Sequence, residues 1–110
     1  MDISEDRKAD VVILAMAGKL DATTAKAFED KILAEIDSGD RRFVIDLSQL
    51  DYVSSSGLRV FLLAAKRLNS TAGKLVLCCL TDHVRQVFEL AGFLSLFPFY
   101  GSRDEAINNV

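Results

Sequence analysis

Three apolar runs of strand length divide the chain, at residues 11–17, 43–47 and 75–80. They are rich in β-branched residues and apolar at consecutive positions, which is typical of strands covered on both faces of a sheet. We therefore predict three central strands over these ranges. The segment 3–7 is predicted to pair with the first run as an antiparallel edge hairpin.

Helical periodicity follows each of the three runs, because apolar residues recur there three and four positions apart. Four helices are predicted, at residues 22–36, 57–69 and 82–91 and in a short C-terminal segment that begins at Ser102 or Asp104. Candidate helix caps are Asp21, Thr23 or Thr24 for the first helix and Thr81 or Asp82 for the third. Alternating strands and helices predict an α/β fold: one domain over residues 1–110, with a mainly parallel mixed sheet, an antiparallel edge strand and about four flanking helices.

Composition narrows the possible partners. A chain of 110 residues, half of them hydrophobic, is long enough for one core without disulfides or metal ions. Its 13 basic residues against 16 acidic ones give a net charge of −3, so we expect no nucleic-acid partner. No apolar run reaches the roughly 18 to 20 residues of a membrane-spanning helix, and no signal peptide is evident. We expect a cytoplasmic protein without membrane insertion.

The two cysteines, Cys78 and Cys79, are adjacent inside the third apolar run. Consecutive side chains of a strand point to opposite faces, so the pair does not resemble a redox site, and we interpret both as buried fillers of the core in a reducing compartment. No spacing typical of metal ligands is present. We therefore expect no metal ion and no cofactor.

Candidate chemistry lies at the carboxyl ends of the predicted strands, where open α/β sheets bind ligands and partners. The segment Gly18-Lys-Leu-Asp21 follows the first strand, and a loop over residues 48–57 follows the second. This loop places Ser54, Ser55 and Ser56 at a predicted helix N-terminus, which favours an anion. One serine is interpreted as a helix N-cap, or, alternatively, one carries a phosphoryl group that changes the charge seen by a partner. Gly57 beside them allows close approach of another chain or ligand.

Enzymatic use of these serines has little support in the sequence. The single histidine, His83, begins another helix, and neither a nucleophile elbow nor a phosphate-binding loop is present. Asp21 is predicted to cap the first helix, with a serine hydroxyl or a phosphate as a further neighbour. Solvent exposure or turn bonding accounts for Asp46 and Asp51. Arg59, in the first turn of its helix, is expected at the surface, where it faces a partner or a phosphate.

Residues 46–60, which read Asp-Leu-Ser-Gln-Leu-Asp-Tyr-Val-Ser-Ser-Ser-Gly-Leu-Arg-Val, resemble a STAS domain of the bacterial anti-sigma factor antagonist type. Gly18-Lys-Leu-Asp21, Gly73-Lys-Leu-Val76 and residues 87–93 extend the resemblance over nearly the whole chain. The resemblance implies a protein that, when unphosphorylated, binds an anti-sigma factor that is also a serine kinase, and so releases a sigma factor. Phosphorylation by this kinase breaks the complex, and a PP2C-type phosphatase restores it.

By this resemblance Ser55 is the phosphate acceptor. The family motif has Asp where this chain has Ser54. The partner-binding residues are expected to be Asp21, Ser54, Ser56, Gly57, Leu58 and Arg59. Two alternatives stay open: a STAS subunit that docks on the ATPase of a lipid transporter without phosphorylation, and, with least support, an enzyme that acts through Ser55.

Overall fold

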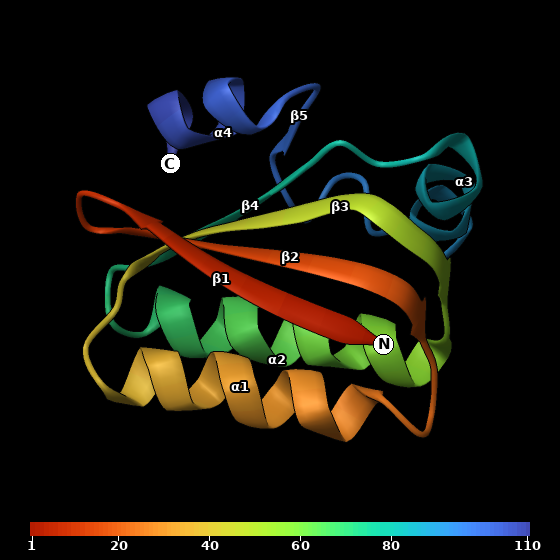
Figure 1. The fold of residues 1–110 in the computed structure, drawn as a ribbon, viewed down its shortest axis with the longest axis horizontal. Helices are drawn as coiled ribbons and strands as arrows, with labels where there is room; N and C mark the ends of the chain where they lie inside the picture. Colours follow the sequence, from red (N-terminus) through yellow and green to blue (C-terminus); the bar gives the residue numbers. More distant parts are fainter.

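The computed structural model describes all of residues 1–110 and contains five strands and four helices (Figure 1). The strands are β1 (Asp2–Lys8), β2 (Val11–Leu20), β3 (Arg42–Val53), β4 (Lys74–Cys78) and β5 (Phe99–Tyr100). The helices are α1 (Ala25–Asp37), α2 (Ser55–Asn69), α3 (Asp82–Leu90) and α4 (Arg103–Asn109). The predicted α/β fold and its four helices are confirmed.

The strands lie side by side in chain order, β1-β2-β3-β4-β5. The edge hairpin is confirmed, since β1 is antiparallel to β2 with Ile3 opposite Met16 and Arg7 opposite Val12. The other pairs are parallel. Each connection between parallel strands leads to the next strand on the same side of the sheet. Because such connections are right-handed, their helices lie on one face of the sheet. Figure 1 shows α1 and α2 together on that face and α4 on the other.

The larger core lies between the sheet and helices α1, α2 and α3, and comprises 23 buried residues. Phe61 of α2 is at its centre, with ring centroids 5.1 Å from Phe28 of α1 and 5.5 Å from Phe88 of α3. A smaller cluster of six buried residues, which includes Ala106 of α4, lies on the opposite face. The helix pair α1/α2 is therefore anchored far more extensively than α4.

The strand predicted over residues 43–47 is much longer in the structure, and the loop predicted over residues 48–57 is wrong. β3 continues to Val53 and pairs with an extension of β2 that ends at Leu20. Two register shifts interrupt this ladder, so that buried residues recur every third position, at Leu47, Leu50 and Val53. Gly18 lies at the second shift with a φ of +101°, a conformation that glycine adopts most readily.

Element ends differ elsewhere too. α1 begins at Ala25 rather than at residue 22, and α2 begins at Ser55 rather than at residue 57. The strand predicted over residues 75–80 ends at Cys78. The two-residue strand β5, whose Phe99 pairs with Leu77, was not predicted, because so short a segment has no periodicity of its own.

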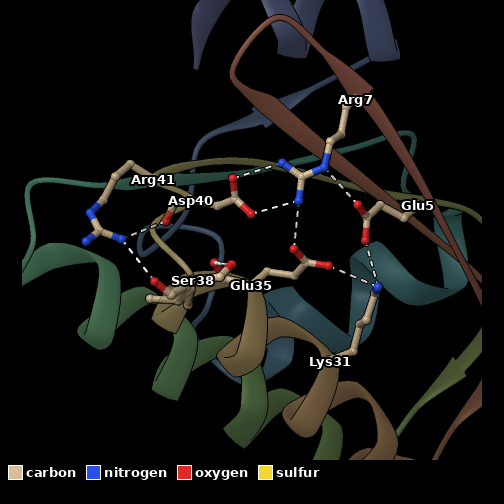
Figure 2. Close-up of polar contacts among 8 residues, drawn as sticks. Glu5, Arg7, Lys31, Glu35, Ser38, Asp40 and Arg41 are labelled. Carbon is tan, nitrogen blue, oxygen red and sulfur yellow. Dashed lines mark hydrogen bonds and ion pairs between the residues drawn. The ribbon is translucent and has the colours of Figure 1, made fainter.

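An ion-pair network attaches the edge strand β1 to α1 (Figure 2). Arg7 pairs with Asp40, Glu35 and Glu5 at 2.8 to 2.9 Å, and Lys31 bridges Glu5 and Glu35 at 2.6 and 3.0 Å. The carboxyl of Glu35 and the ammonium of Lys31 lower the pKa of Glu5 to about 2, while contact with Glu5 raises the pKa of Glu35. The network adds charge contacts between an almost fully exposed strand and the helical layer to the apolar packing of Ile3 against the core.

Candidate functional site

The ends of β2 and β3 bring together the two segments that the sequence analysis singled out. Leu20 lies opposite Val53 in the ladder, and the backbone N–H of Ser54 donates to the carbonyl of Leu20 at 2.8 Å. Asp21 and Ser55 therefore follow neighbouring strand ends. The two candidate segments thus meet at one edge of the sheet.

Each of the three serines has a different environment. Ser54 is the N-cap of α2, and its half-buried hydroxyl accepts a hydrogen bond from the N–H of Gly57 at 3.2 Å. Ser55, the first helical residue, is exposed, and Ser56 is half-buried. The first N–H groups of a helix have no acceptor within it, so those of Ser55 and Ser56 and the helix dipole favour an anion here. The predicted position of the serines at the start of this helix is confirmed, and Ser55 is the one of the three that is exposed.

Gly57 and Leu58 lie beneath the serines and are buried. A Cβ atom on Gly57 would lie 2.7 Å from Cγ of Leu20 and 3.1 Å from Cγ2 of Val53. The close approach that Gly57 permits is therefore that of α2 to the chain's own strands, and not of a ligand. Both residues pack α2 against the sheet, and any partner contacts the side chains around them.

Of the three residues predicted as candidate caps of α1, the structure has Thr24 at the N-cap position, without a side-chain cap hydrogen bond, and Asp21 instead holds the turn that leads into the helix. Its carboxylate accepts hydrogen bonds from the hydroxyl of Thr23 at 2.7 Å, from the N–H of Thr23 at 3.0 Å and from the N–H of Thr24 at 3.3 Å. These bonds, those of Thr23 first, lower the pKa of Asp21. No serine hydroxyl is among its partners. Asp21 thus adds a fixed negative charge beside the serines without being bonded to them.

Arg59 is exposed on the same side of α2 as Ser55, because residues four apart on a helix are neighbours. Its guanidinium donates to Glu29 of α1 across a distance of 3.1 Å. The sequence analysis missed Glu29, since nothing in the pattern of α1 alone indicates a partner on another helix. It also missed Tyr52, an aromatic residue 42% exposed near the end of β3, because that segment was interpreted as a loop.

Several other candidates lie outside this site. His83 on α3 and Asp51 on β3 are exposed. Of the two predicted accounts of Asp46, solvent exposure is wrong, since the residue is 7% exposed in the middle of β3 and pairs with Arg103 of α4 at 2.8 Å. Local bonding of the turn type is confirmed, since the Asp46 carboxylate accepts from the N–H of Ser48, two residues on, at 2.9 Å. Burial raises the pKa of Asp46, but hydrogen bonds from Ser48 and Arg103 outweigh burial and leave the pKa below its ordinary value.

The two cysteines differ as well. Cys78 is fully buried, as predicted, and burial raises the pKa of its thiol. Cys79 is only half-buried and lies beyond the end of β4, so its interpretation as a buried strand residue is wrong. None of the four helices is long and apolar enough to cross a membrane.

Comparisons with known proteins agree with the fold. The family model of the STAS domain matches residues 2–106, so the chain belongs to the STAS domain family. The protein named "Putative anti-sigma factor antagonist BtrV" from Bordetella bronchiseptica is 46% identical over 106 residues, which are 96% of this chain and 91% of that protein. An anti-sigma-B factor antagonist of Listeria monocytogenes is 30% identical over 107 residues, 96% of this chain and 92% of its own. In three dimensions, an anti-sigma factor antagonist from Mycobacterium paratuberculosis is similar with a TM-score of 0.90 at 26% identity, over 99% of this chain and 92% of that one.

Proposed function

We propose that this STAS domain is an anti-sigma factor antagonist whose binding is switched by phosphorylation of Ser55. The unphosphorylated form binds an anti-sigma factor that is also a serine kinase, and so frees a sigma factor. A PP2C-type phosphatase removes the phosphate. The names of the relatives at 46% and 30% identity support the antagonist over the transporter subunit. The chain acts in the cytoplasm, with residues 1–110 as one domain, as the kinase's substrate and not as an enzyme.

The choice of Ser55 rests on one observation: among the three serines, only its hydroxyl is both exposed and free of hydrogen bonds. The hydroxyl of Ser54 is occupied as the helix cap, and Ser56 is half-buried. A kinase must reach the acceptor oxygen from solvent and bring a phosphoryl group to it. Ser55 alone offers that access without loss of the cap.

A phosphate on Ser55 would change the surface more than the fold. It adds nearly two negative charges at the start of α2, where backbone N–H groups and the helix dipole stabilise them. The same charges join the carboxylate of Asp21 on the neighbouring loop. A partner that fits the neutral hydroxyl would meet a strongly anionic, hydrated surface instead, so its binding is lost although the domain stays folded.

Arg59 gives this switch a second component. It lies four residues after Ser55 and is held by Glu29 through one exposed ion pair. A phosphate dianion on Ser55 competes for the guanidinium and leaves Glu29 with Lys26, at 3.7 Å, as its remaining cation. Phosphorylation would thus rearrange side chains on α1 as well as on α2, and the region from Asp21 to Arg59 would act as one binding surface.

Intact-mass measurement after incubation with the anti-sigma factor kinase and ATP tests the proposal. The wild-type chain should gain one phosphate, mapped to Ser55. The variant Ser55→Ala should fold, bind the kinase and gain none, whereas Ser55→Asp should bind at least about tenfold more weakly, which is about 1.4 kcal/mol.

Ser56→Ala is the matched control, because it removes the adjacent hydroxyl and should still be phosphorylated. Wild-type phosphate incorporation in Ser55→Ala would refute the assignment of Ser55. If no kinase binds, and a transporter ATPase is captured equally by wild type and Ser55→Asp, the antagonist function itself is wrong.

A further inference from the structure

The backbone at Cys79 has an unusual conformation that changes the relation between the two cysteines. Its φ is +63°, in the left-handed region that residues other than glycine seldom occupy. The N–H of Cys79 donates to the carbonyl of Tyr100 at 3.1 Å, which fixes the residue beside β5. In a regular strand the two thiols would point to opposite faces. Here the alternation is broken between Cys78 and Cys79.

The consequence is a cluster of three potential ligands. The sulfur atoms of Cys78 and Cys79 and a carboxylate oxygen of Asp46 all lie within 4.8 Å of one another. Asp46 comes from β3 and lies opposite Cys78 of β4 in the ladder, so two adjacent strands and the residue that follows β4 build the cluster. Strained backbone that persists in a well-packed region is a reason to look for function at that place.

One side of the cluster is open to solvent. Cys79 lines a cavity of about 180 Å³ whose other lining residues are Leu80, Arg85, Phe99, Tyr100 and Gly101. Cys78 and Asp46 are buried and do not line this cavity. An ion can therefore reach the thiol of Cys79 first and be enclosed by the other two groups.

We propose that Cys78, Cys79 and Asp46 bind a thiophilic divalent cation, of which Zn²⁺ is the type that combines thiolate and carboxylate ligands most readily. Three protein ligands leave the fourth position of a tetrahedral ion for a water molecule on the cavity side. This site is separate from the serine site and does not depend on the function proposed above.

The charges at the site balance with and without the ion. Without it, two neutral thiols accompany the ion pair between Asp46 and Arg103. When a divalent cation binds, both thiols lose their protons to solvent, and the two positive charges of the ion replace those two protons. The sum over ion, thiolates, carboxylate and guanidinium is then zero, so binding leaves no net charge in the interior.

Asp46 is already held in a position suited to a ligand. Oδ2 accepts hydrogen bonds from Nη2 of Arg103 at 2.8 Å and from Nε at 3.1 Å, and Oδ1 accepts one from the N–H of Ser48 at 2.9 Å. A carboxylate has about four lone-pair positions, so coordination need not displace these donors. Hydrogen bonds of this kind orient the ligands of metal sites in general.

Cadmium is a direct probe, because cadmium–thiolate bonds absorb in the ultraviolet. The metal-free chain, kept reduced with a phosphine, is titrated with Cd²⁺ while the charge-transfer band is recorded. The band should saturate at one ion per chain, Zn²⁺ should abolish it, and calorimetry in two buffers should show release of about two protons per ion.

Cys79→Ser should roughly halve the band at saturation and weaken binding at least about tenfold. Asp46→Asn should weaken binding while the band at saturation stays unchanged. His83→Ala is the matched control, since it removes the single histidine and should bind as the wild type does. Absence of a saturating band in the wild type, or an unchanged titration in folded Cys79→Ser, would overturn the proposal.

Discussion

Two helix N-termini lie side by side at the carboxyl edge of the sheet, and the polar groups around them differ. At α1, the Asp21 carboxylate accepts from the N–H groups of Thr23 and Thr24. At α2, the Ser54 hydroxyl accepts from the N–H of Gly57 alone. The first terminus follows a turn held by a carboxylate, so a fixed negative charge lies beside it, whereas the second keeps its dipole and two N–H groups available.

This difference explains why only one of two adjacent termini suits a phosphate. A carboxylate beside a helix N-terminus repels an incoming anion, while a hydroxyl cap is neutral. In the motif that the chain resembles, Asp stands at the position of Ser54, so both termini would have a carboxylate beside them. With Ser54, the chain confines the fixed charge to Asp21.

The largest expected effect comes from Gly57→Ala, which tests whether α2 must approach its strands closely. The new Cβ would lie 2.7 Å from Cγ of Leu20, and overpacking of this kind costs about 1 to 3 kcal/mol. The loss should exceed the helix-propensity gain of about 0.5 to 1 kcal/mol for Gly to Ala. Urea denaturation measures the free energy of unfolding. Gly101→Ala is the control, since nothing lies within 4 Å of its Cβ position, and equal stability of both variants would contradict the packing argument.

Replacements at Ser54 should have intermediate effects. Ser54→Ala removes the cap of α2 and should lower the free energy of unfolding by about 1 kcal/mol. Ser54→Asp keeps a cap and, in the unphosphorylated chain, should be at least as stable as the wild type, because a carboxylate interacts favourably with the helix dipole.

The same Ser54→Asp variant should lose stability once Ser55 is phosphorylated, since two anions then share one terminus. Thermal denaturation of the unphosphorylated and phosphorylated forms measures whether the effect of Ser54→Asp on stability changes from stabilising to destabilising. A Ser54→Asp chain that is equally stabilised with and without phosphate would show that the charge of the cap is irrelevant to the switch.

The smallest effect is expected for Asp21→Asn, and it depends on pH. Hydrogen bonds lower the pKa of Asp21 below its ordinary value of 3.8. Above that value the carboxylate is ionised in both folded and unfolded chains, so its stabilisation is complete. As the pH falls toward the lower folded pKa, the unfolded chain takes up its proton first and the stabilisation is lost. The stability difference between wild type and Asp21→Asn should therefore shrink below pH 3.8, and a difference independent of pH would contradict the role of the charge.

Much of the architecture could be predicted from local patterns. The apolar runs gave the central strands, and the helical spacing of residues such as Phe28 and Phe61 gave the helices that cover them. The site was also accessible to sequence reasoning, because strand ends in a parallel sheet share an edge, and that brings Asp21 to Ser55.

The remaining features depend on pairing between distant segments. The extension of β3 is hidden because register shifts bury Leu50 and Val53 at a spacing of three, which matches neither a regular strand nor a helix. Burial of Asp46 required a cation from α4, 57 residues away in the chain. The left-handed turn at Cys79 has no signature in residue type, since glycine is the residue that usually marks such a position.

The hydrogen bond from Ser54 N–H to Leu20 carbonyl has a practical consequence for mutagenesis. It joins the ends of β2 and β3 through peptide groups alone, so replacement of any side chain by alanine leaves it intact. The effects of such replacements at the two strand ends will therefore look independent of one another. Only proline at position 54, which lacks the N–H, would sever this link. Thermodynamic cycles that combine side-chain replacements in the two loops will therefore underestimate how strongly the loops communicate.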